Sequence, residues 1–531
     1  MNPPLTPIHS IPNRSKQKKQ RTELGRAALE LSRENSLAGA RRAALSPSAF
    51  SAASCSIEVF RQSFIGFSLS LLLMCVPSVR SAELKLGTAA VPINPPVGIG
   101  LAGYYHERGN EGVLDDIAAK AVVLDDGQTR TAIVVCDLIS MPQWIVVEAR
   151  QLIETRTGIP GTNVVIAATH THTAPVLYRE WSRDDTDGGA KPVSKEYSHT
   201  LPKLIADAVS LANERRQPVR ISVAREQESQ LAKNRRYWMR DGSVGWNPGK
   251  LNPQIVRAAG PIDPEVGVFY AETTAPKPVP MLTFVNYAMH PDTTGGTRIS
   301  ADYPGALSRA LALYKGPDML TLFANGTCGN INHTDVLWAG AQSSPQEATR
   351  LGTVLAAAVF KAYPRLQPLT NAVPLRVRRE IVKLPLPPFT PAELEAARFD
   401  VRTAKDNTRD GFMKLVRAHR ILDTAAREGR PQEVEMQVIA LGRDVAWVAW
   451  PGEIFVELGL SVKAGSPFAH TYNVELANGT IGYIPNKSAY PEGNYEVESA
   501  RVAEGSGELL VTSALRMLAE LSAEANRARQ P

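Results

Sequence analysis

Strand-like and helix-like patterns alternate along much of this chain. Apolar runs typical of buried strands occupy residues 118–126, 130–138, 163–170, 279–290 and 318–330. Stretches with helical spacing occupy residues 144–158 and 303–316, and residues 446–463 read as a strand, a turn and a helix. This alternation predicts an α/β fold in which helices cover a mixed sheet in layers.

Two features refine this organisation. The runs at 118–126 and 130–138 are joined by a short Asp- and Gly-containing turn, which predicts a β-hairpin. A proline-rich segment at 383–394 opens a charged helical stretch over about residues 385–430. We interpret that stretch as an α-helical insertion in one catalytic domain spanning residues 82–531.

The first 81 residues have a different character. They hold 11 basic and 4 acidic residues, and an apolar run at 64–76 precedes the small residues Val79 and Ser81. Such a run has the length of a signal-peptide core and is short for a membrane span. We expect cleavage between Ser81 and Ala82, and export to the periplasm, the cell surface or the medium. The alternative is a buried hydrophobic helix.

Charge and cysteine content narrow the function classes. Residues 82–531 hold 48 basic and 49 acidic residues, so the predicted mature chain has no basic field for nucleic acid. We find no nucleic-acid motif and no evident partner protein. Four cysteines occur, and cleavage would leave only Cys136 and Cys328, which is no disulfide framework. We expect both thiols to be free.

The stretch "AATHTHTAP" at 167–175 places two of the chain's nine histidines one residue apart. In an extended segment, residues i and i+2 point the same way, so His170 and His172 would share one face. Two imidazoles on one side suit a metal ion, or a metal ligand beside a proton-transfer group. The alternative is a pair of surface histidines at a strand end.

Strand ends point to the same region. The predicted strands at 163–170 and 279–290 end in His170 and His290, and the strand at 446–450 leads into Glu453. Ligands gather beyond the carboxyl ends of strands in α/β sheets, so these three side chains can converge. Two histidines and one carboxylate, with an open position for water, form a catalytic zinc arrangement.

At this point the sequence resembles the neutral/alkaline ceramidases, a family of non-lysosomal zinc amidohydrolases. "ATHTHTAP" is similar to the family's A-T-H-T-H-S-G-P, and "MHPDTTG" at 289–295 resembles its second histidine segment. "KNRR" at 233–236 and "PGEIF" at 451–455 resemble its N-R and P-x-E-F motifs. "GYIPNKSAYPEGNYE" at 482–496 resembles its Y-I-T-T-x-E-E-Y-x-x-x-x-Y-E segment. The motifs occur in the family's order.

The resemblance implies a set of roles. It implies one zinc ion per chain, attack by zinc-bound hydroxide on an N-acyl amide or a related ester, and a ceramide-like lipid substrate. It implies His172 as the proton-transfer group, and Arg235 and Tyr495 as donors to the developing oxyanion. The implied zinc ligands are His170, His290, Glu453 and Tyr483.

The sequence also departs from the family pattern. The family loop G-D/N-x-S-P-N is "GNINHT" here, so Asn332 stands at the serine position. An amide is no nucleophile, but it can hydrogen-bond a substrate, and attack by metal-bound hydroxide needs no serine. We expect Cys328 to be a structural thiol and not a substitute nucleophile. The C-terminal β-sandwich usual in the family is not expected in this chain.

Two other functions remain open at this stage. A barrel-type metal-dependent amidohydrolase also uses H-x-H at a strand end. A non-catalytic lipid- or glycan-binding relative would explain Asn332. For the leading interpretation we expect a lipid-like amide or ester substrate and at most peripheral contact with a membrane surface.

Overall fold

The structure is a computed structural model that describes residues 83–369 and 374–527. The predicted leader, with its apolar run at 64–76 and its expected cleavage site, lies outside the described residues. Within the described part, no helix is both long and apolar enough to cross a membrane.

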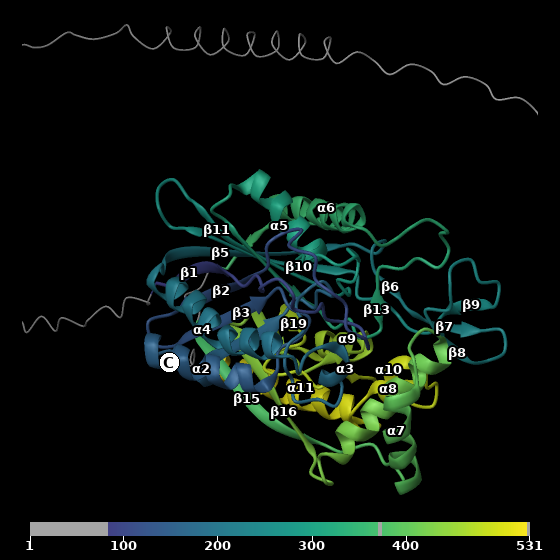
Figure 1. The fold of residues 1–531 in the computed structure, drawn as a ribbon. Helices are drawn as coiled ribbons and strands as arrows, with labels where there is room; N and C mark the ends of the chain where they lie inside the picture. The colour runs from purple at the N-terminus through teal and green to yellow at the C-terminus, as the bar shows by residue number, and fades with distance from the viewer. Residues whose placement is uncertain (1–82, 370–373, 528–531) are drawn as a thin grey trace, which may run out of the picture. The chain divides into compact units, whose positions relative to one another are not determined.

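A nine-stranded mixed sheet forms the centre of the fold (Figure 1). Its strands lie in the order β12-β11-β10-β5-β1-β2-β3-β4, and β14 pairs with β5. The pairs β3–β4 and β11–β12 are parallel, and the other pairs are antiparallel. The strands are β1 (Lys85–Pro92), β2 (Ala118–Asp125), β3 (Arg130–Cys136), β4 (Val164–Ala168), β5 (Gln217–Gln227), β10 (Glu265–Thr273), β11 (Pro280–Tyr287), β12 (Leu320–Asn325) and β14 (Gln367–Pro368).

A short contact joins the two halves of this sheet. Strand β1 pairs with β2 over its whole length, but with β5 only through Lys85–Pro218 and Leu86–Gln217. One half therefore consists of β1 to β4, and the other of β5, β10, β11 and β12. Strands β2 and β3 form the antiparallel hairpin that the sequence predicts.

A four-stranded sheet packs face to face on the large sheet. Its order is β15-β16-β17-β19, with β17 and β19 parallel. Aromatic side chains fill the space between the sheets: the ring centroids of Phe284 and Tyr472 are 5.2 Å apart, and Trp447 also contacts both rings. The strands are β15 (Leu375–Leu384), β16 (Gln432–Leu441), β17 (Val445–Ala449) and β19 (His470–Val474).

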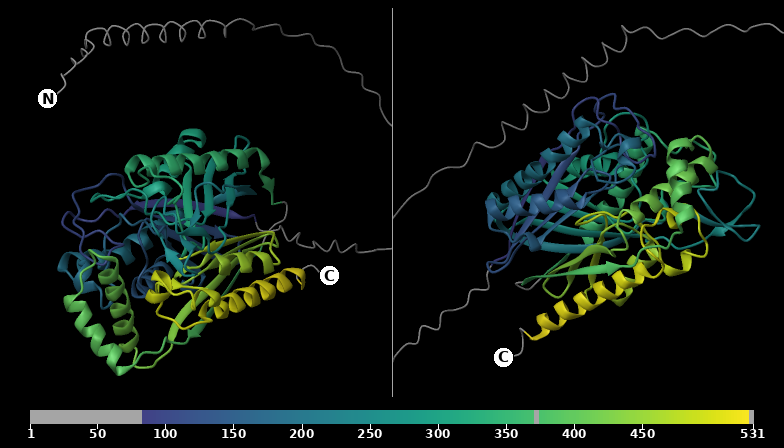
Figure 2. Two further views of the ribbon diagram at one scale, coloured as in Figure 1. Left: turned by 90° about the vertical axis from the view of Figure 1, so that its right-hand side faces the viewer. Right: turned by 60° about the horizontal axis from the view of Figure 1, so that its bottom comes forward.

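Helices cover the outer faces of both sheets, which gives four layers (Figure 2). Helices α2 and α4 pack on the β1–β4 half, α5 and α6 on the other half, and α9 and α11 on the four-stranded sheet. The layered α/β fold with a mixed sheet is thus confirmed. The helices are α2 (Gln143–Thr157), α4 (Pro192–Glu214), α5 (Asp302–Lys315), α6 (Pro345–Ala362), α9 (Val456–Gly465) and α11 (Ser506–Arg527).

Helix α2 shows how local sequence sets these elements. Its side chains Ile145, Ala149 and Ile153 recur every four residues and are buried against the sheet. Gly158 ends the helix in a left-handed conformation (φ 67°), and its N–H donates to the Glu154 carbonyl. Glycine adopts this conformation without a steric penalty, so the helix ends where the sequence predicts.

Three strand–helix–strand units point their loops to one region. They are β3-α2-β4, β11-α5-β12 and β17-α9-β19, and the two strands of each unit are parallel. The carboxyl ends of β4, β11 and β17 lead to His170, His290 and Glu453. Loops at the carboxyl ends of such strands are the usual place for ligand sites.

Helices α7 (Pro391–Thr403) and α8 (Arg409–Ala425) form a hairpin between β15 and β16, which projects from the body in Figure 1. Thr390 and Glu393 form a capping box that starts α7. The helical stretch expected over about 385–430 is therefore two helices, because residues 404–408 interrupt it and Thr408 caps the second helix.

Three small sheets and two short helices complete the frame of the site. We call residues 236–258 the flap; its three strands project from the body beside α8 (Figure 1). The short helices are α3 (Asp184–Asp187) and α10 (Tyr495–Ser499). The small sheets are β6 (Lys233–Asn234) with β13 (Ile331–Asn332), β18 (Glu453–Ile454) with β20 (Tyr483–Ile484), and β7 (Arg236–Met239) with β8 (Val244–Trp246) and β9 (Ile255–Ala258).

Candidate functional site

A turn, not an extended strand, positions His170 and His172. Strand β4 ends two residues before His170, whose backbone is left-handed (φ 76°). The expectation of an extended segment is therefore wrong. The His170 N–H donates to the Leu138 carbonyl (2.8 Å) and the His172 N–H to the Pro291 carbonyl (3.1 Å). These bonds to neighbouring loops fix the turn.

The turn still brings both imidazoles to the ring of His290. The Nε2 atoms of His170 and His172 are 3.4 Å apart, and the ring centroids of His170 and His290 are 4.5 Å apart. One ring nitrogen from each of the three histidines lies within 4.8 Å of the other two. This group could hold a metal ion.

Carbonyl oxygens orient two of the rings. Nδ1 of His290 lies 2.8 Å from the Cys328 oxygen and 2.9 Å from the Ile331 oxygen. Nδ1 of His170 lies 2.7 Å from the Ile139 oxygen. A carbonyl oxygen only accepts, so Nδ1 carries the proton in each ring and Nε2 keeps its lone pair. This is the usual second contact of a metal-binding histidine.

Glu453 completes the convergence predicted from the strand ends. Its Oε2 lies 3.3 Å from Nε2 of His170 and 3.3 Å from Nε2 of His290. The parallel register of β18 and β20 pairs Glu453 directly with Tyr483. Glu453 therefore lies beside both histidines and is paired in the backbone with Tyr483, so the four residues that the resemblance implies as zinc ligands are neighbours in space.

The environment sets the charge of these groups. Burial raises the pKa of the Glu453 carboxyl, but His170 and His290 outweigh it and hold that pKa well below its usual range. Burial lowers the pKa of His290 to about 3, and burial with the neighbouring His170 holds the pKa of His172 well below its usual range. Burial also lowers the pKa of His170, but Glu453 outweighs it and the pKa is raised. An ionised Glu453 carboxylate beside the neutral rings of His290 and His172 suits metal binding, and a metal ion would displace the proton that Glu453 favours on His170.

Buried atoms without partners test the fit to a metal. Among the described residues, Nε2 of His290 and Oε2 of Glu453 are buried and form no hydrogen bond. Unpaired buried polar atoms are costly, and a cation between them would satisfy both. Two imidazoles and a carboxylate fit zinc. Tyr483 remains the predicted fourth ligand, and His172 is a further nitrogen donor close by.

Arg235 lies against the predicted ligand Tyr483. Its Nη2 donates to the Tyr483 hydroxyl (3.0 Å) and to the Gly329 carbonyl (2.7 Å), while its Nε donates to Glu496 (2.9 Å). The Tyr495 ring lies 5.3 Å from the Tyr483 ring, centroid to centroid. Both residues predicted to contact the oxyanion are thus beside the cluster. Glu496, which orients Arg235, was not predicted.

Asn332 lies at the edge of the site on β13. Its Nδ2 donates to Oδ1 of Asn247 (3.1 Å), and its Oδ1 accepts from the Thr334 N–H (3.1 Å). The amide therefore connects β13 to the flap. Whether it also contacts substrate, as the sequence predicts, remains a prediction.

Two carboxylates near the cluster were missed by sequence reasoning. Asp292 Oδ1 lies 3.8 Å from Nδ1 of His172, a buried nitrogen that has no hydrogen-bond partner among the described residues. Glu475 follows β19 and accepts from the N–H groups of Ile454 (3.1 Å) and Cys328 (3.0 Å). The strand-end argument that identified Glu453 also applies to Glu475, so this residue could have been found.

Cys328 is a structural thiol in this arrangement. Its Sγ donates to Oε1 of Glu475 (2.8 Å), and it is completely buried. Burial, with Glu475 nearby, raises the pKa of this thiol well above its usual range, so the reactive thiolate is disfavoured. Cys136 is also free and buried.

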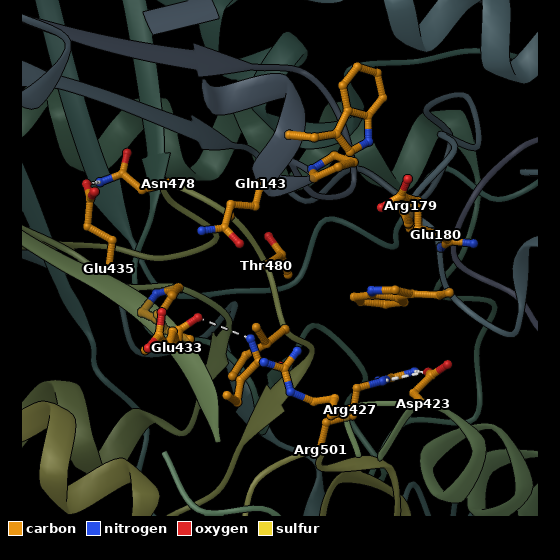
Figure 3. Close-up of a pocket in the computed structure, with 18 of the residues that line it drawn as sticks. Gln143, Arg179, Glu180, Asp423, Arg427, Glu433, Glu435, Asn478, Thr480 and Arg501 are labelled. Carbon is orange, nitrogen blue, oxygen red and sulfur yellow. Dashed lines mark hydrogen bonds and ion pairs between the residues drawn. The ribbon is translucent and has the colours of Figure 1, made fainter. Parts of the chain in front are cut away.

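A cavity of about 950 Å³ lies beside the site, but none of the clustered histidines lines it (Figure 3). It borders the loops that carry Glu453 and Tyr483, through Pro451 and Ile481. Its charged side chains largely pair with one another, as Arg501 does with Asp423 at 2.6 Å. Balanced and paired charge gives no indication of a ligand class.

Comparison with known proteins gives matches at the level of structure. No protein-family model matches the sequence, and no curated protein matches it. A solved structure of neutral ceramidase from Pseudomonas aeruginosa is similar with a TM-score of 0.65 and 17% identity, covering 83% of this chain and 75% of that one. A structure described as a ceramidase complexed with C2 has a TM-score of 0.65 and 16% identity, covering 85% and 76%. The chain therefore has the neutral ceramidase fold, as the sequence motifs predict.

Proposed function

We propose that this protein is a zinc-dependent hydrolase that splits an N-acyl amide, or a related ester, of a lipid-like substrate. The observation that carries the proposal is the convergence of His170, His290 and Glu453. Two atoms at the centre of this convergence, Nε2 of His290 and Oε2 of Glu453, are buried without a hydrogen-bond partner among the described residues. The similar solved structures are ceramidases, and ceramide is an N-acyl amide. The proposal combines this likeness of fold with the chemistry of the cluster.

The chain's own residues suit the steps of amide hydrolysis. When bound, zinc would supply Lewis acidity that activates water and polarises the substrate carbonyl. His172 would accept the proton of the attacking water at Nε2 and return it to the leaving amine. Arg235 and Tyr495 would donate hydrogen bonds to the carbonyl oxygen as its charge develops.

The attack needs no acyl-enzyme intermediate. Asn332 offers no nucleophilic oxygen, and the Cys328 thiol is buried and held neutral by its environment. Direct attack by water is therefore the pathway that these side chains support. The substrate would bind between the cluster and the flap, where the ring centroids of Tyr495 and Trp246 lie 4.4 Å apart.

The two alternative functions are less well supported. A barrel-type amidohydrolase is excluded by the fold, because residues 83–369 and 374–527 form two packed sheets with helices outside. A non-catalytic binding relative would need no proton-transfer group beside the metal ligands, yet His172 lies 3.4 Å from His170.

We also propose export after cleavage near Ala82, which N-terminal sequencing of the secreted protein would test.

Hydrolysis of a panel of N-acyl lipids and esters tests the proposal. We expect turnover of at least one substrate, loss of activity with a chelator, and recovery with zinc. His170→Ala should lose bound zinc and activity together, because it removes a ligand. His199→Ala, at an exposed position on α4, should keep both. Full activity in zinc-free protein, or wild-type zinc content in His170→Ala, would contradict the proposal.

A further inference from the structure

Three large apolar side chains are exposed together beside the site. Leu251 is 59% exposed, Leu337 80% and Trp338 50%. Leu251 belongs to the flap, and the other two belong to the loop after β13. We call these three residues the apolar tip. Exposed apolar clusters of this kind mark interaction surfaces more often than single exposed side chains do.

The loop after β13 is built to hold its apolar side chains outward. Buried Gln342 accepts from the Asp335 N–H (2.7 Å) and donates to the carbonyls of Asp335 (2.9 Å) and Trp338 (3.0 Å). The Leu337 N–H donates to the Asp335 side chain (2.9 Å). A loop with this many internal bonds does not expose Leu337 and Trp338 by disorder. It presents them in a defined position.

The flap side of the apolar tip is also fixed. Leu251 has a left-handed backbone (φ 52°), which is unfavourable for a bulky residue. Its N–H donates to the Val336 carbonyl (2.7 Å), and Nζ of Lys250 donates to the Gly340 carbonyl (2.6 Å). These bonds join the two loops into one surface and place a cation at its edge.

The loops that carry the apolar tip also reach the candidate site. Four residues before Leu251, Asn247 accepts the hydrogen bond from Asn332. Its neighbour Trp246 packs against Tyr495, which the proposed mechanism uses. Both loops that carry the apolar tip therefore have their bases in the candidate site. A partner held at the apolar tip would contact loops that reach the candidate site.

We propose that the apolar tip docks the protein onto the surface of a lipid bilayer. Leucine and tryptophan side chains insert at the boundary between headgroups and acyl chains, and tryptophan favours that depth. The Lys250 stem can lie along the apolar surface while its amine contacts lipid phosphate. The purpose of docking, delivery of an N-acyl lipid to the site, rests on the proposed function, but the docking itself does not.

Tryptophan fluorescence of the full chain can detect this contact. All seven tryptophans lie after residue 82, so the apolar run at 64–76 contributes no signal even if it binds lipid. Vesicles of phosphatidylcholine and phosphatidylserine that carry brominated acyl chains should quench the wild-type protein. Trp338→Phe should lose most of that quenching, because Trp338 is the tryptophan at the apolar tip.

Matched variants separate docking through the apolar tip from nonspecific adsorption to vesicles. Leu337→Glu should lower vesicle affinity about tenfold or more, the factor expected when one leucine leaves an apolar environment. Leu313→Glu on α5, at a position 92% exposed, should leave vesicle affinity unchanged. Lys250→Ala should weaken binding to phosphatidylserine vesicles more than to pure phosphatidylcholine vesicles. Thermal unfolding checks that all variants are folded.

The outcomes also separate this proposal from the proposed function. Equal quenching in wild type and Trp338→Phe, or equal loss of vesicle affinity in Leu337→Glu and Leu313→Glu, would overturn docking through the apolar tip. A change of molecular mass by light scattering in Leu337→Glu, without a change in vesicle affinity, would instead identify an interface between copies. Vesicle binding without turnover of any N-acyl lipid or ester of the panel would refute the hydrolase and leave docking standing.

Discussion

His170 and His172 are one residue apart but lie in different environments. His170 turns Nε2 toward Glu453 and is held from behind by the Ile139 carbonyl. His172 faces Asp292 through an Nδ1 that has no hydrogen-bond partner within the described ranges. A ligand needs a fixed ring beside an anionic co-ligand, whereas a proton-transfer group needs one nitrogen facing the reacting atoms, here Nε2, and a carboxylate near the other. This difference favours the ligand role for His170 and proton transfer for His172.

The predicted roles can be separated by His172→Ala. We expect turnover to fall roughly 10²–10⁴-fold while zinc stays bound, because general acid–base catalysis contributes about that much. Zinc content by mass spectrometry and kcat on a soluble amide are the two measurements. Loss of zinc from this variant would instead make His172 a ligand, which the distances between the three histidines also permit.

Asn332→Ala tests whether the position normally held by serine in the resembled family is needed. The substitution removes the hydrogen bonds to Asn247 and Thr334. The predicted bond from Asn332 to substrate is uncharged and contributes about 0.5–1.5 kcal/mol, so we expect a loss of activity of roughly tenfold or less. Complete inactivity with the fold and zinc intact, or a trapped acyl-enzyme at any residue, would contradict direct attack by water.

At the scale of elements, helix α8 connects the insertion to the site. Phe412 of α8 lies 5.5 Å from the Tyr495 ring and 5.9 Å from the Trp246 ring, centroid to centroid. Further along α8, buried His419 lies with its Nδ1 2.9 Å from the Ser182 hydroxyl. The helical hairpin therefore forms one wall of the site and is held by a buried histidine.

That histidine predicts a pH dependence of stability. Burial, with the neighbouring Arg183, lowers the pKa of His419 from its ordinary 6.5 to about 4. Between these values only the unfolded chain takes up the proton, so stability falls as the pH drops from about 6.5 to about 4. The full effect is about 3 kcal/mol. His419→Gln should flatten this part of the pH–stability curve measured by denaturant unfolding.

A control keeps the pH experiment specific. His199→Asn, at an exposed position on α4, should leave the slope between pH 6.5 and 4 as in wild type. An equal slope in wild type and His419→Gln would show that other groups produce the acid sensitivity. Asp423, which lies near His419, should be kept in both variants because its charge partly opposes the shift.

Most elements could be predicted because their local sequence determines them. The runs that became β2, β3, β11 and β12 are apolar and bounded by turn residues, and Gly158 marks the end of α2. The turn at His170 could not be predicted, since a left-handed histidine is held by bonds to Leu138 and to the loop after His290. Those partners are distant in sequence.

At the scale of the molecule, the strand-end rule correctly predicted that His170, His290 and Glu453 converge, but it did not predict how the two edges of the large sheet approach each other. Strands β4 and β12 lie at opposite edges of the nine-stranded sheet. They approach because the segment after β19 joins both: the Glu475 N–H donates to the Asn325 carbonyl, and the Ala168 N–H to the Leu476 carbonyl. Pairing across three units of chain leaves no local sequence signal, so the approach of these two edges could not be predicted.

Metal binding should stabilise the whole protein. The predicted ligands come from both halves of the large sheet and from the segment after β17, so a bound ion would hold three units together. A ligand at about a hundredfold its Kd adds about 2.7 kcal/mol. We expect zinc to raise the Tm of chelator-treated wild type in calorimetry and to leave His170→Ala unchanged. An equal rise in both proteins would place the stabilising ion elsewhere.

The short contact between β1 and β5 has a consequence for the geometry of the site. The two residue pairs of the β1–β5 ladder by themselves give little resistance to a change in the angle between the halves of the large sheet. His170 follows a strand of one half and His290 a strand of the other. The spacing of these two imidazoles therefore depends on the angle between the halves, which the four-stranded sheet beneath them sets. Substitutions in that interface, far from the histidines, would act on catalysis by changing this angle.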